Sequence, residues 1–165
     1  MSGNTSIIEY LNEQYKSCKQ ITAMYVKKTP KERLRQKFDL VRKEVYWLQQ
    51  LDGFDRVPQL IKHNTKSFIM TYKGIQLTKE NTPTDWESQI NYIITSLEKL
   101  NVSHNDIQEE ELLILNGKIQ LIDFQHGTHG RAAFEKIIKS GKAVNRVRVD
   151  DRTAITEILQ QLSKS

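Results

Sequence analysis

Three acidic residues of the sequence could bind a metal ion if the fold brings them to one place. Asp106 lies in a polar loop, Glu111 follows five residues later, and Asp123 comes after the next apolar stretch. Carboxylate oxygens suit Mg²⁺, which prefers one or two protein carboxylates together with the phosphates of a substrate. Phosphate chemistry is therefore a hypothesis that the surrounding elements can support or weaken.

The pair Asn116-Gly117 between two apolar runs predicts a two-residue β-hairpin turn. Such a turn fixes the register of the hairpin and places Glu111 opposite Ile122. Asp123, the next residue, then lies beside Glu111 at the open end of the hairpin. The competing interpretation is a solvated acidic loop that only aids solubility, and the residue types alone favour it, because charged runs usually face water.

Two further regions carry the periodicities of regular structure. Residues 20–28 and 67–72 are rich in β-formers and are predicted to be strands. A capping box at Thr29–Glu32 predicts a helix to about Leu51, with an apolar stripe at Leu34, Phe38, Val41, Val45 and Leu48. A second capping box at Thr84–Glu87 predicts a helix with the stripe Trp86, Ile90, Ile93, Leu97 and Leu100. Helices are also expected over about 132–140 and about 152–162, the latter opened by Asp150 or Asp151.

Composition bounds the class of protein. The chain has 165 residues and a net charge of +5, and residues 1–50 hold the basic surplus. No apolar run reaches the ~20 residues of a membrane span, the N-terminus lacks the pattern of a signal peptide, and Cys18 is the single cysteine. We therefore expect a cytoplasmic protein with no membrane partner. Nucleic acid is not an expected partner, because no aromatic residues interleave the basic run.

The acidic segment resembles the catalytic segment of the protein kinase superfamily. The family pattern is His-Arg-Asp, four residues, Asn, and later Asp-Phe-Gly. This sequence has His104-Asn105-Asp106, Glu111 in the Asn position, and Asp123-Phe124-Gln125. In its brevity the chain resembles atypical kinases such as the RIO family and the small kinase of the KEOPS complex. Tyr25-Val26-Lys27, the helix after it, Val57-Pro58 and a short hinge resemble aminoglycoside phosphotransferases.

Upstream residues follow the order of the same family. Tyr25-Val26-Lys27 resembles the lysine strand, and Glu44 lies on the following helix where the ion-pair glutamate belongs. The segment resembling the gatekeeper and the adenine-holding hinge consists of Met70, Thr71, Tyr72 and Lys73. Lys28 is the rival for the role of Lys27, because neighbouring residues of a strand point to opposite faces.

The resemblance implies an α+β, minimal protein kinase-like fold in one truncated domain over residues 1–165. Residues 1–72 would form a lobe with a small antiparallel sheet and one helix, and residues 73–165 a reduced, mainly helical lobe. The cofactors implied are ATP and Mg²⁺ or Mn²⁺. Asp106 would be the catalytic base, and Asp123 and Glu111 would hold the metal. Asp150 resembles the aspartate that bonds the catalytic-loop backbone, although it could equally be a simple helix cap.

These roles predict transfer of a phosphoryl group from ATP to a hydroxyl. A Ser/Thr protein kinase is the leading hypothesis. The alternatives are a small-molecule kinase of the aminoglycoside-phosphotransferase type and a pseudokinase that acts as a binding module. We also expect an activating protein partner with an acidic face, because Leu40, Tyr46 and Trp47 lie off the main stripe of a helix beside basic residues.

Overall fold

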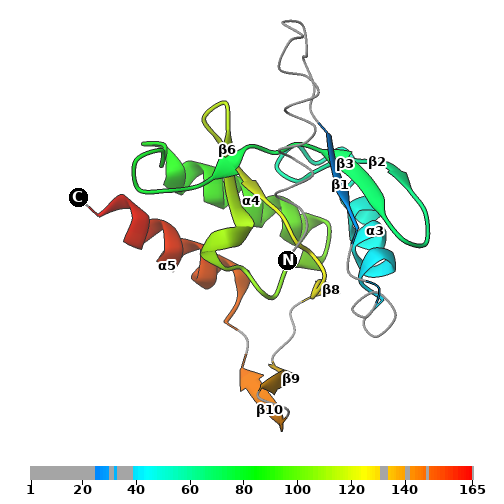
Figure 1. Cartoon of the computed structure of the whole chain (residues 1–165). Coiled ribbons are helices and arrows are strands. Elements are labelled where there is room, and N and C mark those ends of the chain that lie inside the picture. Colours follow the sequence, from blue (N-terminus) through cyan, green and yellow to red (C-terminus); the bar gives the residue numbers. More distant parts are fainter. Residues whose placement is uncertain are drawn as a thin grey trace, which may run out of the picture. The chain divides into compact units, whose positions relative to one another are not determined.

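The computed structural model describes residues 25–29, 32, 39–130, 134–139, 142–147 and 149–164, the stretches 134–139 and 142–147 by their backbone alone. The chain divides into two compact units, Met1–Lys73 and Gly74–Ser165, and each is described by itself (Figure 1). Both combine helices with small antiparallel sheets, which confirms the α+β class. No helix within these described ranges is long and apolar enough to span a bilayer.

The first unit is a three-stranded sheet with a helix packed on it. Its elements are β1 (Tyr25–Lys28), α3 (Leu40–Gln50), β2 (Leu60–His63) and β3 (Phe68–Thr71), with the strand order β1-β3-β2. The buried core joins helix and sheet through Val26, Val41, Val45, Leu48, Phe68 and Met70.

The predicted strands are confirmed over Tyr25–Lys28 and Phe68–Thr71, and residues 20–24 lie outside the described residues. The helical stripe from Val41 onward is also confirmed. The predicted start of this helix at Thr29 is wrong for α3, because Asp39 has a left-handed φ of 51° and is the N-cap from which α3 begins. Residues 30–31 and 33–38 lie outside the described residues.

The second unit contains more strand than expected. Its elements are β4 (Ile75–Gln76), α4 (Trp86–Lys99), β5 (Val102–Ser103), the 3₁₀ turn η1 (Glu109–Glu111), β6 (Leu112–Leu115), β7 (Lys118–Leu121), β8 (Thr128–His129), β9 (Phe134–Lys139), β10 (Lys142–Val147) and α5 (Asp151–Ser163). The strands form the ladders β4-β6-β7, β5-β8 and β9-β10.

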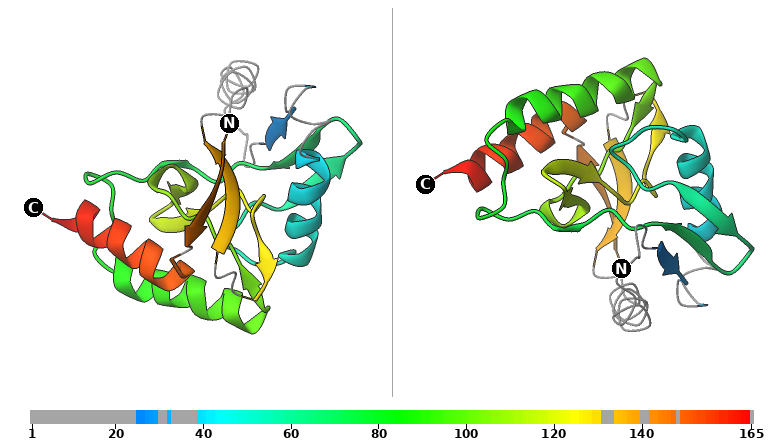
Figure 2. Two further views of the ribbon diagram at one scale, coloured as in Figure 1. Left: turned by 90° about the horizontal axis from the view of Figure 1, so that it is seen from below. Right: turned by 90° about the horizontal axis from the view of Figure 1, so that it is seen from above.

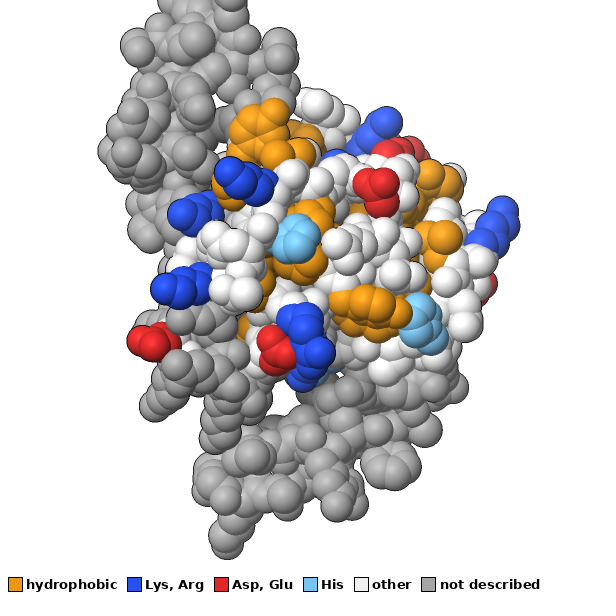
Figure 3. Space-filling view, turned by 90° about the vertical axis from the view of Figure 1, so that its right-hand side faces the viewer, with side chains coloured by type: hydrophobic (Ala, Val, Ile, Leu, Met, Phe, Trp, Pro, Cys, Tyr) orange, Lys and Arg blue, Asp and Glu red, His pale blue; other side chains and the backbone are white. Residues whose placement is uncertain are grey.

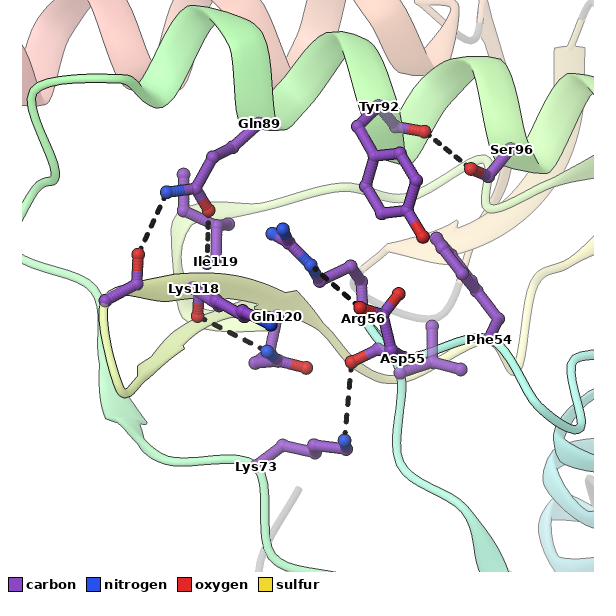
Figure 4. A network of polar contacts seen from close by, with 12 residues as sticks. Phe54, Asp55, Arg56, Lys73, Gln89, Tyr92, Ser96, Lys118, Ile119 and Gln120 are labelled. Carbon is purple, nitrogen blue, oxygen red and sulfur yellow. Dashed lines mark hydrogen bonds and ion pairs between the residues drawn. The ribbon is translucent and has the colours of Figure 1, made fainter.

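The hairpin β6–β7 has the predicted register. Leu115 pairs with Lys118, and both turn residues, Asn116 (φ 51°) and Gly117 (φ 74°), have the positive φ of a type I′ turn. Gln89, buried on α4, secures the turn: its Nε2 donates to the Gly117 carbonyl at 2.9 Å and its Oε1 accepts from the Ile119 N–H at 2.8 Å (Figure 4). The hairpin is thus held rigidly at its closed end.

Strand β4 approaches the hairpin so closely that it needs a glycine before it. Gly74 has φ 105°, and a Cβ built there would lie 2.0 Å from the Ile114 carbonyl oxygen. Any side chain would therefore push β4 away from β6.

Helices α4 and α5 lie side by side (Figures 1 and 2). Their buried faces carry Ile90, Ile93, Ile94 and Leu97 on α4 and Ile155 and Leu159 on α5. Arg152 links the helices through Asn91 Oδ1 at 3.0 Å and Glu98 Oε1 at 3.5 Å. The prediction of α5 is confirmed. The capping box predicted for α4 is wrong, because the N-cap residue is Asp85 and its carboxylate accepts from the Gln89 side chain instead.

The helix predicted over about 132–140 is also wrong. Residues 134–139 form β9, which pairs with β10 so that Ile137 lies opposite Val144 and Lys139 opposite Lys142. The β-branched residues of both runs favour strands, and a short apolar run cannot be told from a helix by periodicity alone. The second unit is therefore less helical than the sequence suggested.

Candidate active site

Asp106 lies on a loop that is fixed at its backbone by α5. The N–H groups of His104 and Asn105 donate to the two carboxylate oxygens of Asp151, at 2.7 and 2.9 Å. Two charge-assisted hydrogen bonds from one carboxylate hold consecutive peptide groups in place. Of the two roles that the sequence left open for Asp150, the helix cap is confirmed, and the contact with the catalytic-loop backbone belongs to Asp151 instead. Asp150 is the N-cap, and its Oδ1 accepts from the Thr153 N–H at 2.6 Å.

His104 connects this loop with the strand that precedes Asp123. The ring is completely buried; Nε2 lies 2.7 Å from the Ile122 carbonyl oxygen, and Nδ1 accepts from the Asp106 N–H at 3.2 Å. These contacts fit the neutral ring with its proton on Nε2. Burial lowers the pKa of His104, although the Ile122 carbonyl and nearby carboxylates oppose the shift. The ring also packs edge-on against Phe124, with centroids 4.6 Å apart, so His104 acts as a structural bridge.

Asn105, at the arginine position of the kinase pattern, ties the loop to the segment after Phe124. Its Nδ2 donates to the His126 carbonyl at 2.9 Å and to Thr128 Oγ1 at 2.7 Å. Asn105 has φ 71°, and Asp123 has φ 63°. Left-handed backbone at non-glycine residues costs free energy and tends to occur at functional sites. Both candidate segments contain one such residue.

Asp106 is partly exposed at the end of this framework. Its Oδ1 accepts from Gln108 Nε2 at 3.2 Å, and its Oδ2 lies 3.9 Å from His126 Nε2. The carboxylate is thus positioned by a fixed backbone but remains accessible, as a general base requires.

Glu111 is half-buried next to the same acidic residues. Its Oε2 accepts from the Gln108 N–H at 2.9 Å and caps the η1 turn. Burial, followed by the negative charges of Glu110 and Asp123, raises the pKa of Glu111 to about 7. The main chain continues the hairpin, since the Ile122 N–H donates to the Glu111 carbonyl at 3.0 Å. Glu111 and Asp123 therefore lie at one end of the hairpin, as predicted.

These acidic residues do not form a ready-made metal cage. Among the residues that the structure describes, no three His, Cys, Asp or Glu side chains make a group that could hold a metal by themselves. Mg²⁺ often binds through one or two carboxylates and completes its shell with phosphates and water. The mutual repulsion around Glu111 is relieved when a cation binds, so Asp123 and Glu111 fit a site of that kind.

In the first unit, Lys28 and not Lys27 pairs with Glu44. Lys28 Nζ lies 3.2 Å from both carboxylate oxygens of Glu44, and only 2% of Lys28 and 4% of Glu44 is exposed. Lys27 is exposed on the other face of β1. The sequence contains a signal that distinguishes the two lysines. Alternate residues of a strand point to the same face, so if the apolar Val26 faces the core, Lys28 faces it as well. The predicted pairing of Lys27 with Glu44 was therefore wrong, and nucleotide binding by either lysine stays a prediction.

The four residues predicted to hold adenine end the first unit. Met70 is buried in its core, and the Thr71 hydroxyl oxygen accepts from the Gln59 N–H at 2.9 Å. Burial raises the pKa of Tyr72. Lys73 Nζ donates to the Asp55 carbonyl at 3.5 Å (Figure 4). Nucleotide binding by these residues stays a prediction.

Comparison of the sequence with protein-family models and with curated proteins finds no match.

Proposed function

We propose that this protein is an ATP-dependent phosphotransferase with Asp106 as its catalytic base. The observation that carries the proposal is the double attachment of the Asp106 loop. Asp151 holds its backbone, and His104 joins it to the residue before Asp123. A base and a metal ligand kept in fixed register are what phosphoryl transfer requires, because its catalysis consists mainly of positioning and charge neutralisation.

In the proposed reaction, the oxygen of the acceptor hydroxyl forms a bond to the γ-phosphorus of ATP. The bond from that phosphorus to the bridging oxygen breaks, and ADP leaves with its electron pair. The hydroxyl proton passes to a carboxylate oxygen of Asp106. Asp123 and Glu111 would hold Mg²⁺ or Mn²⁺, which, when bound, neutralises charge on the phosphate oxygens.

Lys28 takes over the phosphate-binding role that the resemblance gave to Lys27. The pair with Glu44 fixes its ammonium group in a buried position, and a fixed cation suits a phosphate better than a mobile one. Met70, Thr71, Tyr72 and Lys73 remain the proposed adenine-binding segment. The proposed acceptor is a Ser or Thr of a protein, with an aminoglycoside-like small molecule as the alternative.

An activating protein partner belongs to the proposal because α3 presents a groove on the side away from Glu44. The groove has a volume of about 570 Å³, and it is lined by the β2–β3 turn and by Asp39, Val41, Arg42, Val45, Tyr46 and Gln49. Arg42 forms an ion pair with Asp39.

Tyr46 is 41% exposed, whereas Trp47, which was expected beside it on the surface, is buried. Hydrophobic, Lys/Arg, His and Asp/Glu side chains share the surface in Figure 3. Because Asp39 balances Arg42, the apolar side chains are the main contact surface that the groove offers to a partner. The proposed partner with an acidic face would stabilise the helix that carries Glu44 when it binds.

The test is transfer of labelled phosphate from ATP, with Mg²⁺ or Mn²⁺, to generic protein acceptors. Asp106→Ala, Asp123→Ala and Lys28→Met should each abolish transfer, whereas Lys27→Met and Glu87→Ala, the latter at an exposed residue of α4, should not. Full activity of Asp123→Ala would exclude this mechanism. Tight nucleotide binding without any transfer would favour the pseudokinase alternative.

A further inference from the structure

A groove of about 660 Å³ lies within the second unit, between the Asp106 loop and one side of α5. The helix contributes Ala154, Glu157, Ile158 and Gln161, which follow the i, i+3, i+4, i+7 spacing of a single helical face. Its volume falls within the range of ligand-binding clefts. From Ala154 to Gln161 the helix rises about 10 Å, a length that suits about three residues of extended peptide.

The charges in this groove are of one sign. The described residues that line it include Asp106, Glu109, Glu110 and Glu157 and no Lys, Arg or His, although the whole chain has a net charge of +5. A phosphate-rich ligand is repelled by such a surface, whereas Lys or Arg side chains are attracted to it.

Apolar side chains accompany the carboxylates. Val149 is 53% exposed and Ile107 is buried, and Ala154 and Ile158 are the other apolar residues of the lining. A basic side chain consists of an aliphatic stem and a charged head, and it binds best where both parts find a partner. The groove offers both kinds of surface to one side chain.

We propose that this groove binds a basic segment of the acceptor protein, with Lys or Arg next to the Ser or Thr that is phosphorylated. The inference rests on the proposed function, because Asp106, the proposed base, is itself part of the lining. A peptide held along α5 brings its hydroxyl to Asp106 while its cations meet Glu109, Glu110 and Glu157. The groove thereby selects the substrate by charge.

The test measures binding separately from catalysis. Three fluorescent peptides of equal length carry one Ser flanked by Arg, Gln or Glu, and anisotropy gives their Kd for the full chain. We expect the Arg peptide to bind about tenfold more tightly than the Gln peptide. Glu157→Lys should abolish this preference, and Glu87→Lys, an exposed charge reversal on α4 outside the groove, should retain it. Equal Kd values for all three peptides, or no effect of Glu157→Lys, would overturn the proposal.

Phosphoryl transfer to the same peptides separates this inference from the proposed function. Phosphorylation of all three peptides with equal kcat/KM would support the phosphotransferase and overturn the role of the groove. Selective binding of the Arg peptide without phosphorylation under any metal condition would retain the groove and contradict the phosphotransferase. If an aminoglycoside displaces the Arg peptide and is phosphorylated in its place, the occupant is a small cation and the peptide proposal is wrong.

Discussion

The ion pair of the first unit joins opposite charges, whereas the acidic site of the second unit brings like charges together. Lys28 and Glu44 are both almost completely buried and neutralise one another at 3.2 Å. Around Glu111, by contrast, burial and then the neighbouring carboxylates of Glu110 and Asp123 raise its pKa to about 7. The pair satisfies its own charges within the fold, whereas the acidic site would gain stability from the cation that the proposed function places there. This difference suggests that one region is preorganised and the other is built to receive a ligand.

Breaking the buried pair should have the largest effect on stability. Glu44→Ala leaves the Lys28 ammonium buried without its partner, and such a change costs about 3–5 kcal/mol. Chemical denaturation of the variant should show this loss. The double variant Lys28→Met/Glu44→Leu should recover most of it, and Lys27→Met should change little. Equal destabilisation by Lys27→Met and Lys28→Met would show that the pair is assigned to the wrong lysine.

Removing the Asp151 carboxylate, which fixes the backbone of the Asp106 loop, should have the next largest effect on stability. Asp151→Ala leaves the N–H groups of His104 and Asn105 without their acceptor, at a cost of about 2–3 kcal/mol, and it should also slow phosphoryl transfer. The matched variant Asp150→Ala removes only a helix cap, worth about 1 kcal/mol, and should preserve transfer. The free energy of unfolding and the rate of phosphoryl transfer are measured for both variants. A greater loss of transfer in Asp150→Ala than in Asp151→Ala would contradict the role given to Asp151.

The pH dependence of the free energy of unfolding tests whether His104 is buried as a neutral ring. The pKa of His104 is lowered in the folded protein, so the unfolded chain binds more protons once the pH falls below its ordinary value of about 6.5. The contribution of His104 is therefore complete above that pH and is lost as the pH decreases. The free energy of unfolding should decline on acidification more steeply in wild type than in His104→Gln. Parallel curves would mean that His104 is not held neutral.

A smaller pH-dependent contribution to stability is expected from Glu111. Its raised pKa means that the folded chain binds more protons than the unfolded chain between about 4.5 and about 7. This contribution to stability is therefore present at low pH and is lost as the pH rises through about 7. Asp123→Asn should lower the pKa of Glu111, as followed by carboxyl ¹³C shifts. Glu87→Gln, far along the sequence on α4, should leave it unchanged.

Local sequence signals predicted the local parts of the site. Asn116-Gly117 was sufficient for the hairpin register, because a two-residue turn leaves one way to pair the strands. The lysine on β1 could also have been found, since Val26 defines the inward face. The contact from Asp151 could not be separated from Asp150, because both neighbours suit a helix start and only tertiary packing decides which one reaches the loop. The β9–β10 hairpin was missed for a similar reason, since Phe134–Lys139 satisfies helical and extended patterns alike.

Metal-dependent nucleotide binding tests the central claim most directly. The thermal midpoint of the full chain should rise with millimolar ATP and Mg²⁺ or Mn²⁺ together, and much less with ATP alone or metal alone, because a ligand stabilises only the state that binds it. Asp123→Asn should lose this dependence on metal, whereas Glu109→Gln should retain it. An unchanged midpoint of the wild-type protein with both MgATP and MnATP would contradict the account.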